Sequence, residues 1–394
     1  MQLASNPYTA LVTKIADMES LLVATRTQAE SDKRLPQDVV DTLCEGGFYR
    51  LFRPKTFGGL ELDPVTEFRV AEALAEIDSA AAWNIQVCNA GDLYGPWFGR
   101  KAIEEVFAND KAIVAGAFNP PRQAVATEGG YILTGTTPFS SNCHGANWIM
   151  GLAIEHDEAG NPVMNDGQPP GLMLTLVPFE ECRIIPNWDT LGLGGTGSHD
   201  VAIDGVFVPA HRVVPFTPNV EPEPEFDGVL ARMAVWVTAA SHAAVALGVA
   251  QAAINDLLAL GARVATYSED GLGTKPRNQA LAAQAEAKLR SARLYFHDAY
   301  DSAWEQIEAT GELSLNDKAQ CQLATTNAAS AAAEVVRLVH ACVGTAGIRK
   351  SHQFEKYFRD VHVITQHAFV SEARLEAVGQ AMFGLEPDWP FFAF

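Results

Sequence analysis

The spacing of apolar residues divides the chain into a helical part, a β-rich part and a second helical part. From residue 8 to about residue 108, apolar residues recur every three or four positions, as in amphipathic helices. Residues 112–215 contain short runs rich in β-branched and aromatic residues, separated by Gly, Pro and Asn, which predict antiparallel strands. Helical spacing returns from Val229 to about Phe383 and is typical of a bundle. We therefore expect an α+β fold with domains at residues 1–111, 112–220 and 221–394.

The composition is that of a globular protein, with 394 residues of which 48% are hydrophobic and 19% are charged. A net charge of −20 argues against binding to nucleic acid or to an anionic membrane surface, because both attract clustered Lys and Arg. The six cysteines form no CxxC pair and no metal-binding spacing, so we expect free thiols in a reducing compartment. The N-terminal residues lack the apolar stretch of a signal peptide, and we expect a cytoplasmic protein.

One glycine motif, at Gly192, Gly194 and Gly197, matches the dinucleotide-binding pattern GxGxxG. That motif has to open a helix whose N-terminus supports the pyrophosphate, but the residues that follow, SHDVAIDGVFVP, predict a strand. His362 and His367 are five residues apart, a spacing that does not place both on one helix face for a shared metal. We expect neither a Rossmann domain nor a metal site.

A polar tract, FSSNCHGANW at residues 139–148, ends one of the predicted strands. Taken alone, it is explained as well by a polar turn as by a binding site. In a binding site, the hydroxyl and the backbone amide of Ser141 would face a heteroaromatic ring that has donor and acceptor edges. The N5 and O4 atoms of a flavin form such an edge.

Near the C-terminus, EKYFRDVHVITQHAF predicts a helix with His367 at the edge of its apolar face. This apolar face consists of Tyr357, Val361, Ile364 and Ala368. A histidine in that position is either a buried core residue or a group that exchanges protons near neutral pH. The residues alone leave both interpretations open.

Four segments, taken in order, resemble the acyl-CoA dehydrogenase superfamily over nearly the whole chain. They are RLPQDVVDTLCEGGFYRLFRPKTFGGLEL, GGYILTGTTPFSSNCHGANW, GLGGTGSHDVAIDGVFVP and GTAGIRKSHQFEKYFRD. The resemblance implies an N-terminal helical domain, a central antiparallel β domain and a C-terminal four-helix bundle, assembled as a homotetramer with flavin at the subunit contacts. This architecture agrees with the division made from the apolar pattern.

The resemblance also implies which residues bind the flavin. Ser141 falls on the Thr that hydrogen-bonds flavin N5, and Phe139 falls on the Trp that packs against the ring. Gly344 and Gly347 fall in a loop that meets the flavin of a neighbouring subunit. Four more residues in these segments or beside them complete the expected flavin site: Ser140, Trp188, Thr196 and Ser198.

The catalytic carboxylate of the dehydrogenases is missing from both positions where the superfamily carries it. A dehydrogenase uses this group to take the α-proton of a thioester. One position, eight residues after Asp360, is Ala368, and the other, on the first helix of the C-terminal domain, falls near Thr238. His367 stands beside the first position in RDVHVITQH, a pattern similar to the flavin-dependent monooxygenase branch of the superfamily.

Members of that branch take reduced FMN or FAD from a separate NAD(P)H:flavin reductase. They form a C4a-hydroperoxyflavin with O₂ and transfer one oxygen atom to a small substrate. The sequence therefore predicts a monooxygenase acting on a small aromatic molecule, in which Ser141 steadies flavin N5–H and His367 takes a proton from the substrate. We expect His367 to titrate at about pH 6.5. An acyl-CoA dehydrogenase that oxidises a thioester and a non-catalytic flavin-binding protein are the alternatives.

Overall fold

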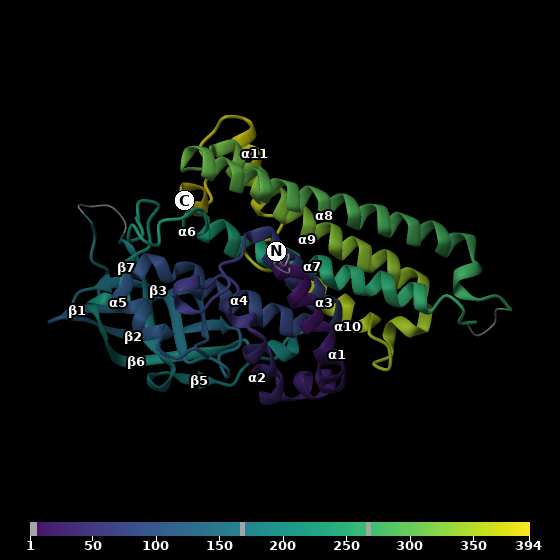
Figure 1. The fold of residues 1–394 in the computed structure, drawn as a ribbon, viewed down its shortest axis with the longest axis horizontal. Helices are drawn as coiled ribbons and strands as arrows, with labels where there is room; N and C mark the ends of the chain where they lie inside the picture. The colour runs from purple at the N-terminus through teal and green to yellow at the C-terminus, as the bar shows by residue number, and fades with distance from the viewer. Residues whose placement is uncertain (1–5, 166–169, 265–268) are drawn as a thin grey trace, which may run out of the picture.

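The computed structural model describes residues 6–165, 170–264 and 269–394, which form a β-sheet domain, a long helical bundle and N-terminal helices that contact both (Figure 1). The side chains of Asn6, Asp63 and Asp78 cap three of these N-terminal helices by accepting hydrogen bonds from N–H groups of their first turns. The α-helices of this region are α1 (Pro7–Asp32), α2 (Gln37–Gly46), α3 (Pro64–Ile77), α4 (Ser79–Phe98) and α5 (Arg100–Phe107).

The central domain is a seven-stranded sheet with the strand order β5-β6-β2-β1-β3-β4-β7. Its strands are β1 (Val114–Thr127), β2 (Gly130–Ser140), β3 (Trp148–His156), β4 (Leu172–Pro178), β5 (Arg183–Ile185), β6 (His199–Pro209) and β7 (Val213–Pro215). The strand β6 directly follows the GxGxxG motif, as the sequence predicts, so this motif does not open an α-helix.

The sheet is mixed, and the expectation of a purely antiparallel domain is wrong at one pair of strands. β1 and β3 run parallel, while the other paired strands are antiparallel. The reason is that β2 returns from β1 as a hairpin and occupies one edge of β1. The polar turn at residues 141–147 then reverses the chain again, so that β3 joins the other edge of β1 in the direction of β1.

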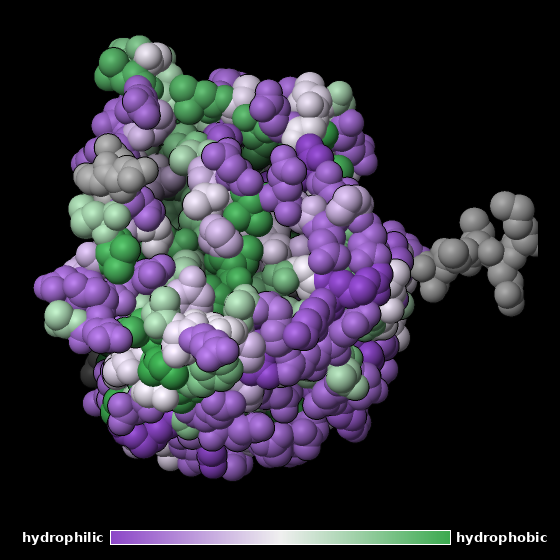
Figure 2. Space-filling view, turned by 90° about the vertical axis from the view of Figure 1, so that its left-hand side faces the viewer, coloured by the Kyte–Doolittle hydropathy of each residue, from purple (hydrophilic) through white to green (hydrophobic). Residues whose placement is uncertain are grey.

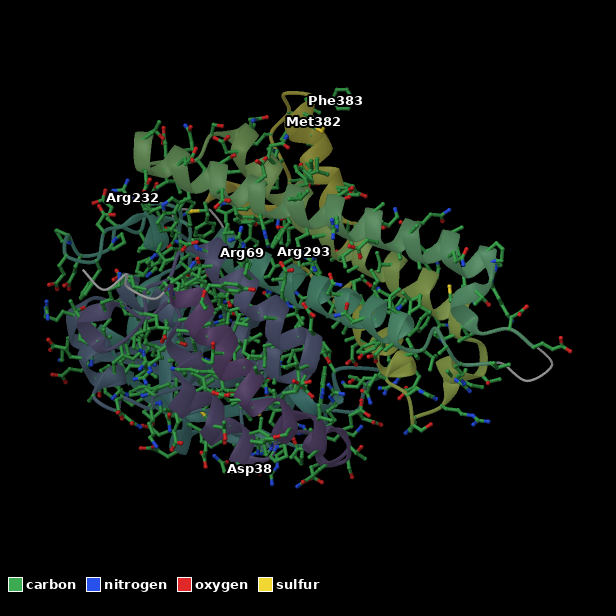
Figure 3. The ribbon with its side chains drawn as sticks, turned by 45° about the vertical axis from the view of Figure 1, so that its right-hand side comes forward. Asp38, Arg69, Arg232, Arg293, Met382 and Phe383 are labelled. Carbon is green, nitrogen blue, oxygen red and sulfur yellow. The ribbon has the colours of Figure 1, made fainter. Side chains whose placement is uncertain are left out.

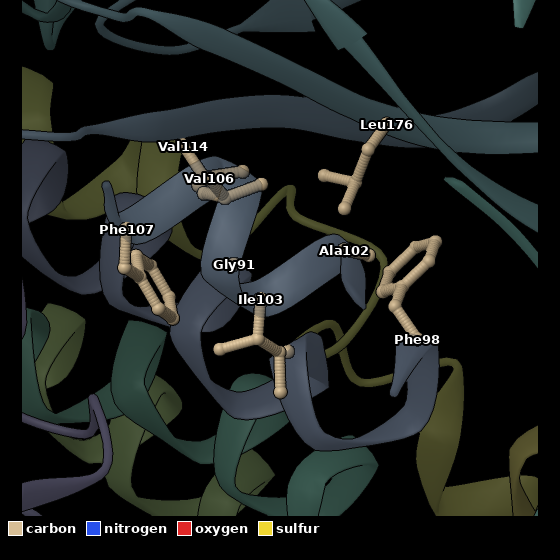
Figure 4. A pocket seen from close by; sticks show the side chains of 9 residues that line it. Gly91, Phe98, Ala102, Ile103, Val106, Phe107, Val114 and Leu176 are labelled. Atoms are coloured by element: carbon tan, nitrogen blue, oxygen red, sulfur yellow. The ribbon is translucent and has the colours of Figure 1, made fainter. Parts of the chain in front are cut away.

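The helices α4 and α5 lie against the sheet (Figure 4), where Val106 of α5 and Phe98 of α4 point toward Val114 and Leu176 of the strands. A Cβ atom added to Gly91 would lie 2.5 Å from Cβ of Val114. Glycine at this position therefore lets α4 pack closely on β1. This contact fixes the position of α4 relative to the sheet.

The C-terminal part is a bundle in which α7, α8, α9 and α10 pack together (Figure 1). Its α-helices are α6 (Val229–Arg232), α7 (Ala234–Ala259), α8 (Pro276–Thr310), α9 (Leu315–Val343), α10 (Phe354–Ile364) and α11 (Arg374–Met382). Among the described residues, two helical segments, α7 and Leu315–Ile348, are long and apolar enough to span a membrane, but 94% of the apolar window in α7 is buried within the protein. Burial in the bundle explains the apolar sequence of α7.

Apolar side chains also reach the surface. Figure 2 shows them gathered in the middle of the face at the β-sheet end, above a hydrophilic region. Met382 and Phe383, at the end of α11, are 71% and 85% exposed, and Figure 3 shows them projecting from the body of the molecule. Exposed apolar side chains of this kind are common where protein subunits meet.

The carboxylate of Asp360 connects three separate parts of the chain. It accepts hydrogen bonds from the Ser79 hydroxyl at the start of α4 (2.6 Å), from the Lys356 ammonium on α10 (2.6 Å) and from the backbone N–H of Leu193 (2.7 Å). Burial by itself raises the pKa of Asp360, but the charge of Lys356 and these hydrogen bonds lower the pKa below its usual value. A buried carboxylate with this set of partners holds the three segments in one arrangement.

We predict that Asp360→Asn lowers the free energy of unfolding by about 3–5 kcal/mol, because it leaves the buried Lys356 charge without its closest partner. Since the folded pKa of Asp360 lies below the unfolded value, this stabilisation is complete at neutral pH and is lost as the pH falls through the folded pKa. Urea unfolding at pH 7 measures the change. The control is Asp227→Asn, which breaks the exposed ion pair with Arg232, a residue labelled in Figure 3, and should cost under about 1 kcal/mol. Equal effects of the two substitutions would contradict the role given to Asp360.

Candidate active site

A cavity of about 670 Å³ lies where the N-terminal helices, the sheet and the bundle meet. Its walls come from α4, the start of β1, the loop between β5 and β6, α7, the segment after α10 and the C-terminal residues. Among the described residues that line it, there is no Asp, Glu, Lys or Arg, and the only histidines are His242 and His367. The cavity is thus large enough for a ring system and almost free of charge.

The polar tract that the sequence singled out forms a tight turn at the edge of this cavity. Phe139 and Asn142 adopt left-handed backbone conformations, with φ of 61° and 58°, which are uncommon for residues other than glycine. The backbone N–H of Asn142 donates to the carbonyl of Thr196 (2.9 Å), and the Cys143 thiol donates to the carbonyl of Gly197 (3.4 Å). The turn is therefore fixed to the loop before β6, and it presents Ser141 to the cavity.

Ser141 belongs to a chain of buried hydroxyl groups that ends on a backbone carbonyl. The hydroxyl of Thr196 donates to the carbonyl of Leu193 (2.8 Å). Ser198 lies 2.7 Å from Thr196, and Ser141 lies 2.7 Å from Ser198. The indole N–H of Trp83 donates to the Ser141 oxygen from the other side (3.0 Å).

The direction of these hydrogen bonds follows from counting hydrogens, because each hydroxyl has one to donate. Thr196 uses its hydrogen on Leu193, so Ser198 must donate to Thr196, and Ser141 must donate to Ser198. Ser141 also accepts from Trp83, which leaves one lone pair on its oxygen. Toward a ligand, Ser141 is therefore an acceptor.

Three of the other expected flavin contacts also line the cavity: Ser198 of the hydroxyl chain, Phe139 and Trp188. Phe139 is 63% exposed, and its ring lies edge-to-face with that of Trp188 at a centroid distance of 6.1 Å. Both residues line the cavity, as does Leu191, which is 65% exposed. Exposed apolar groups beside a cavity provide a surface on which a planar ring can pack.

The remaining expected contacts do not line the cavity. The Ser140 hydroxyl is buried and donates to the carbonyl of Thr137 (3.3 Å), while Thr196 reaches the cavity only through Ser198. Gly344 and Gly347 lie in the short 3₁₀-helix Gly344–Ile348 that follows α9. Their expected contact is with the flavin of a neighbouring subunit and stays a prediction.

The cavity also contains a pair of stacked histidines. The ring of His367 lies on that of His242, with centroids 3.9 Å apart and planes 21° apart, and both rings contact Trp83 edge-to-face. The expected helix through Ala368 is wrong, because α10 ends at Ile364 and His367 lies in the turns beyond it. Leaving the helix lets His367 reach across to α7.

Sequence reasoning missed three groups of cavity residues. His242 stands four positions after Thr238, a spacing that places both on one helix face, and this signal could have found it. Gln86 is 2% exposed, and neither its amide oxygen nor its amide nitrogen has a hydrogen-bond partner. Trp389 and Phe391 come from the C-terminal segment, and no sequence pattern marks them as cavity residues.

The two residues at or near which the sequence resemblance places the base of the acyl-CoA dehydrogenases both line the cavity. Thr238 and Ala368 line it, and neither can remove an α-proton from a thioester. The described lining of the cavity thus lacks the carboxylate that dehydrogenation needs.

Comparisons with known proteins identify the family. The models of the acyl-CoA dehydrogenase N-terminal and C-terminal domains match residues 10–95 and 240–372. Indole-3-acetate monooxygenase of Pseudomonas putida is 31% identical, over 98% of this chain and 97% of that protein. The oxygenase component of an FADH₂-dependent resorcinol hydroxylase of Rhizobium sp. is 27% identical, over 97% and 96% of the two chains.

The chain belongs to the flavin-dependent monooxygenases of the acyl-CoA dehydrogenase family. A solved structure in this family, XiaF from Streptomyces sp. in complex with FADH₂ and glycerol, has a TM-score of 0.90 and 25% identity to this chain, and it covers 97% of both chains. The residues of this monooxygenase fit a flavin, since Ser141 offers an acceptor and Phe139 and Trp188 offer apolar surface.

The imidazoles of His242 and His367 are both kept neutral. Burial lowers the pKa of His367 to about 4, and burial together with the neighbouring His367 lowers the pKa of His242 well below its usual value.

The coupling of oxygen use to product formation by this monooxygenase should not depend on pH between 8 and about 5.5. The two stacked imidazoles keep their hydrogen-bonding roles only while both rings are neutral. Both pKa values are lowered, that of His242 well below its usual value and that of His367 to about 4, in contrast to the value of about 6.5 expected for His367 from sequence. The yields of product and H₂O₂ per O₂ consumed measure the coupling at each pH. A loss of half the coupling near pH 6.5 would contradict the claim that His242 and His367 are both neutral.

Proposed function

We propose that this protein is the oxygenase component of a two-component monooxygenase. It receives reduced FMN or FAD from a separate NAD(P)H:flavin reductase and uses O₂ to add one oxygen atom to a small aromatic substrate. The observation that carries the proposal is that Thr238 and Ala368 line the cavity where an acyl-CoA dehydrogenase would need its catalytic carboxylate. The names "oxygenase component" and "oxygenase subunit" among the relatives support a separate reductase partner.

The hydroxyl chain favours the reduced form of the flavin. Reduced flavin carries a hydrogen on N5 and supplies the electrons that activate O₂ when it is bound. Ser141 has only a lone pair to offer, so it can accept from N5–H. The bare N5 of oxidised flavin needs a donor, and Ser141 could provide one only if the hydrogen bond to Ser198 were broken. FMN and FAD share this ring, and the proposal holds for either.

The cavity favours a substrate that is mostly apolar and has a polar substituent. Aromatic and aliphatic side chains dominate the described lining, and no cationic side chain is present there to pair with an anionic group. Gln86 offers an unused donor and an unused acceptor, which suit a hydroxyl or a ring N–H. The names of two relatives specify indole-3-acetate and resorcinol as their substrates, and phenols and indoles are the classes that we propose here.

We also propose that the protein works in the cytoplasm as a homotetramer. The six cysteines are all free thiols, as in a reducing compartment. The exposed Met382 and Phe383 at the end of α11 are suited to a contact between subunits.

Oxygen transfer is tested directly with isotopes. With FMN, NADH and a generic flavin reductase, the protein should convert a phenol or an indole under ¹⁸O₂ to a product that carries one ¹⁸O atom, as mass spectrometry would show. Heteroaromatic sulfides and amines complete the substrate panel. Acyl-CoA thioesters should not reduce an electron acceptor, because the base is missing. Acyl-CoA oxidation without O₂ would contradict the proposed function and support the dehydrogenase alternative.

Ser141→Ala should raise the share of O₂ that is released as H₂O₂ by about fivefold, since the flavin loses one hydrogen bond worth roughly 1 kcal/mol. The matched control is the neighbouring Ser140→Ala, because the Ser140 hydroxyl bonds to Thr137 and does not line the cavity. H₂O₂ and product are quantified in the same reaction. An equal effect of both substitutions would remove Ser141 from the flavin site.

A further inference from the structure

The stacked histidines differ in the hydrogen bonds that surround them. His242 is 4% exposed and lies on α7, one helical turn after Thr238. His367 lies in the turns that follow α10. Both line the cavity, and the described residues form no hydrogen bond with Nε2 of either ring. Nε2 is therefore the nitrogen through which each ring can meet a ligand.

The hydrogen bond of His242 fixes its neutral form. Its Nδ1 lies 2.9 Å from the carbonyl oxygen of Thr238. A carbonyl oxygen can only accept, so Nδ1 must carry the hydrogen. A neutral imidazole has one N–H, and Nε2 of His242 is consequently left with a lone pair.

The hydrogen bond of His367 has the opposite direction. The backbone N–H of Phe369 donates to Nδ1 of His367 (3.4 Å). A nitrogen that accepts a hydrogen bond carries no hydrogen, so the hydrogen of the neutral ring is on Nε2. Toward the cavity, His242 is thus an acceptor and His367 a donor.

We propose that His242 is the base that takes the substrate's proton, and that His367 donates a hydrogen bond to the same polar group. This inference rests on the proposed function, and it reverses the role that the sequence suggests for His367. In a phenol, the O–H bond breaks, its electron pair stays on the oxygen, and the proton forms an N–H bond at Nε2 of His242. The resulting imidazolium keeps its Nδ1–H bonded to the Thr238 carbonyl, and His367 Nε2–H donates to the phenolate oxygen. The proton passes to water when the product leaves.

Substitution by glutamine separates the two roles, because its amide can donate a hydrogen bond but is not basic. His242→Gln should lower the rate of product formation by about 10²–10⁴-fold, the usual contribution of a general base. His367→Gln, which keeps an N–H donor, should lower it by less than about tenfold. The dissociation constant for reduced FMN, measured anaerobically, should change little in both variants.

The matched control is His362→Gln. His362 has the same hydrogen bond as His242, from Nδ1 to the carbonyl four residues earlier (Phe358, 2.6 Å), but it does not line the cavity. A larger loss of rate in His367→Gln than in His242→Gln would overturn the assignment. If the wild-type protein oxygenated no member of the substrate panel, the proposed function would fail instead.

The wild-type protein gives a second test that needs no folded variant. Its ¹⁵N-histidine NMR spectrum at pH 7 should contain one buried imidazole protonated at Nδ1 and stacked on another protonated at Nε2, identified by their mutual through-space contacts. His242 protonated at Nε2 would overturn the proposal.

Discussion

The carboxylate of Asp360 joins three segments that have to meet before the cavity can exist. Ser79 begins the helix that carries Trp83 and Gln86, and the backbone of Leu193 belongs to the loop that carries Ser198. Lys356 lies on the same helix as Asp360, and the chain continues from this helix to His367. A Cβ atom at Gly192 would lie 2.6 Å from the backbone carbon of Arg359, so glycine is also needed for the loop to reach this helix.

Within the cavity, two backbone carbonyls determine whether the polar side chains donate or accept hydrogen bonds toward a ligand. The carbonyl of Leu193 takes the hydrogen of Thr196, and the chain of hydroxyls then leaves Ser141 as an acceptor. The carbonyl of Thr238 takes the Nδ1 hydrogen of His242, and the ring then has its lone pair on Nε2. A carbonyl oxygen cannot reverse its role, so both side chains are pre-organised before any ligand arrives. The uncharged lining keeps these interactions strong by excluding competing charge.

Much of this arrangement could be predicted from sequence, because the helical and strand periods and the quoted segments are local signals. Ser141 and His367 were found in this way, and both line the cavity. Neighbouring residues were harder to separate: Ser140 and Ser141 are adjacent, yet one hydroxyl bonds to Thr137 and only the other faces the cavity. The parallel pairing of β1 with β3 depends on which edge of β1 remains free, which the strand pattern does not specify. His242 of α7 and Gln86 of α4 come to line one cavity only when the two helices pack together, which the sequence does not show. The lowered pKa of His367 likewise results from its burial in the folded protein.

The account depends most on the claim that Ser141 faces the ligand as a hydrogen-bond acceptor, so that the site is built for reduced flavin. Anaerobic titration of the protein with the oxidised and the photoreduced forms of FMN and FAD measures this preference without any substrate. The hydrogen bond from N5–H of reduced flavin to Ser141 is worth about 1 kcal/mol. In oxidised flavin, the lone pair of N5 would face that of Ser141, which costs more free energy than the loss of this bond. The reduced form should therefore bind at least about tenfold more tightly. Thr196→Val removes the hydroxyl that fixes the direction of the hydrogen bonds in the hydroxyl chain. This substitution should reduce the difference in affinity between reduced and oxidised flavin. Oxidised flavin binding as tightly as reduced flavin, or more tightly, would contradict the account.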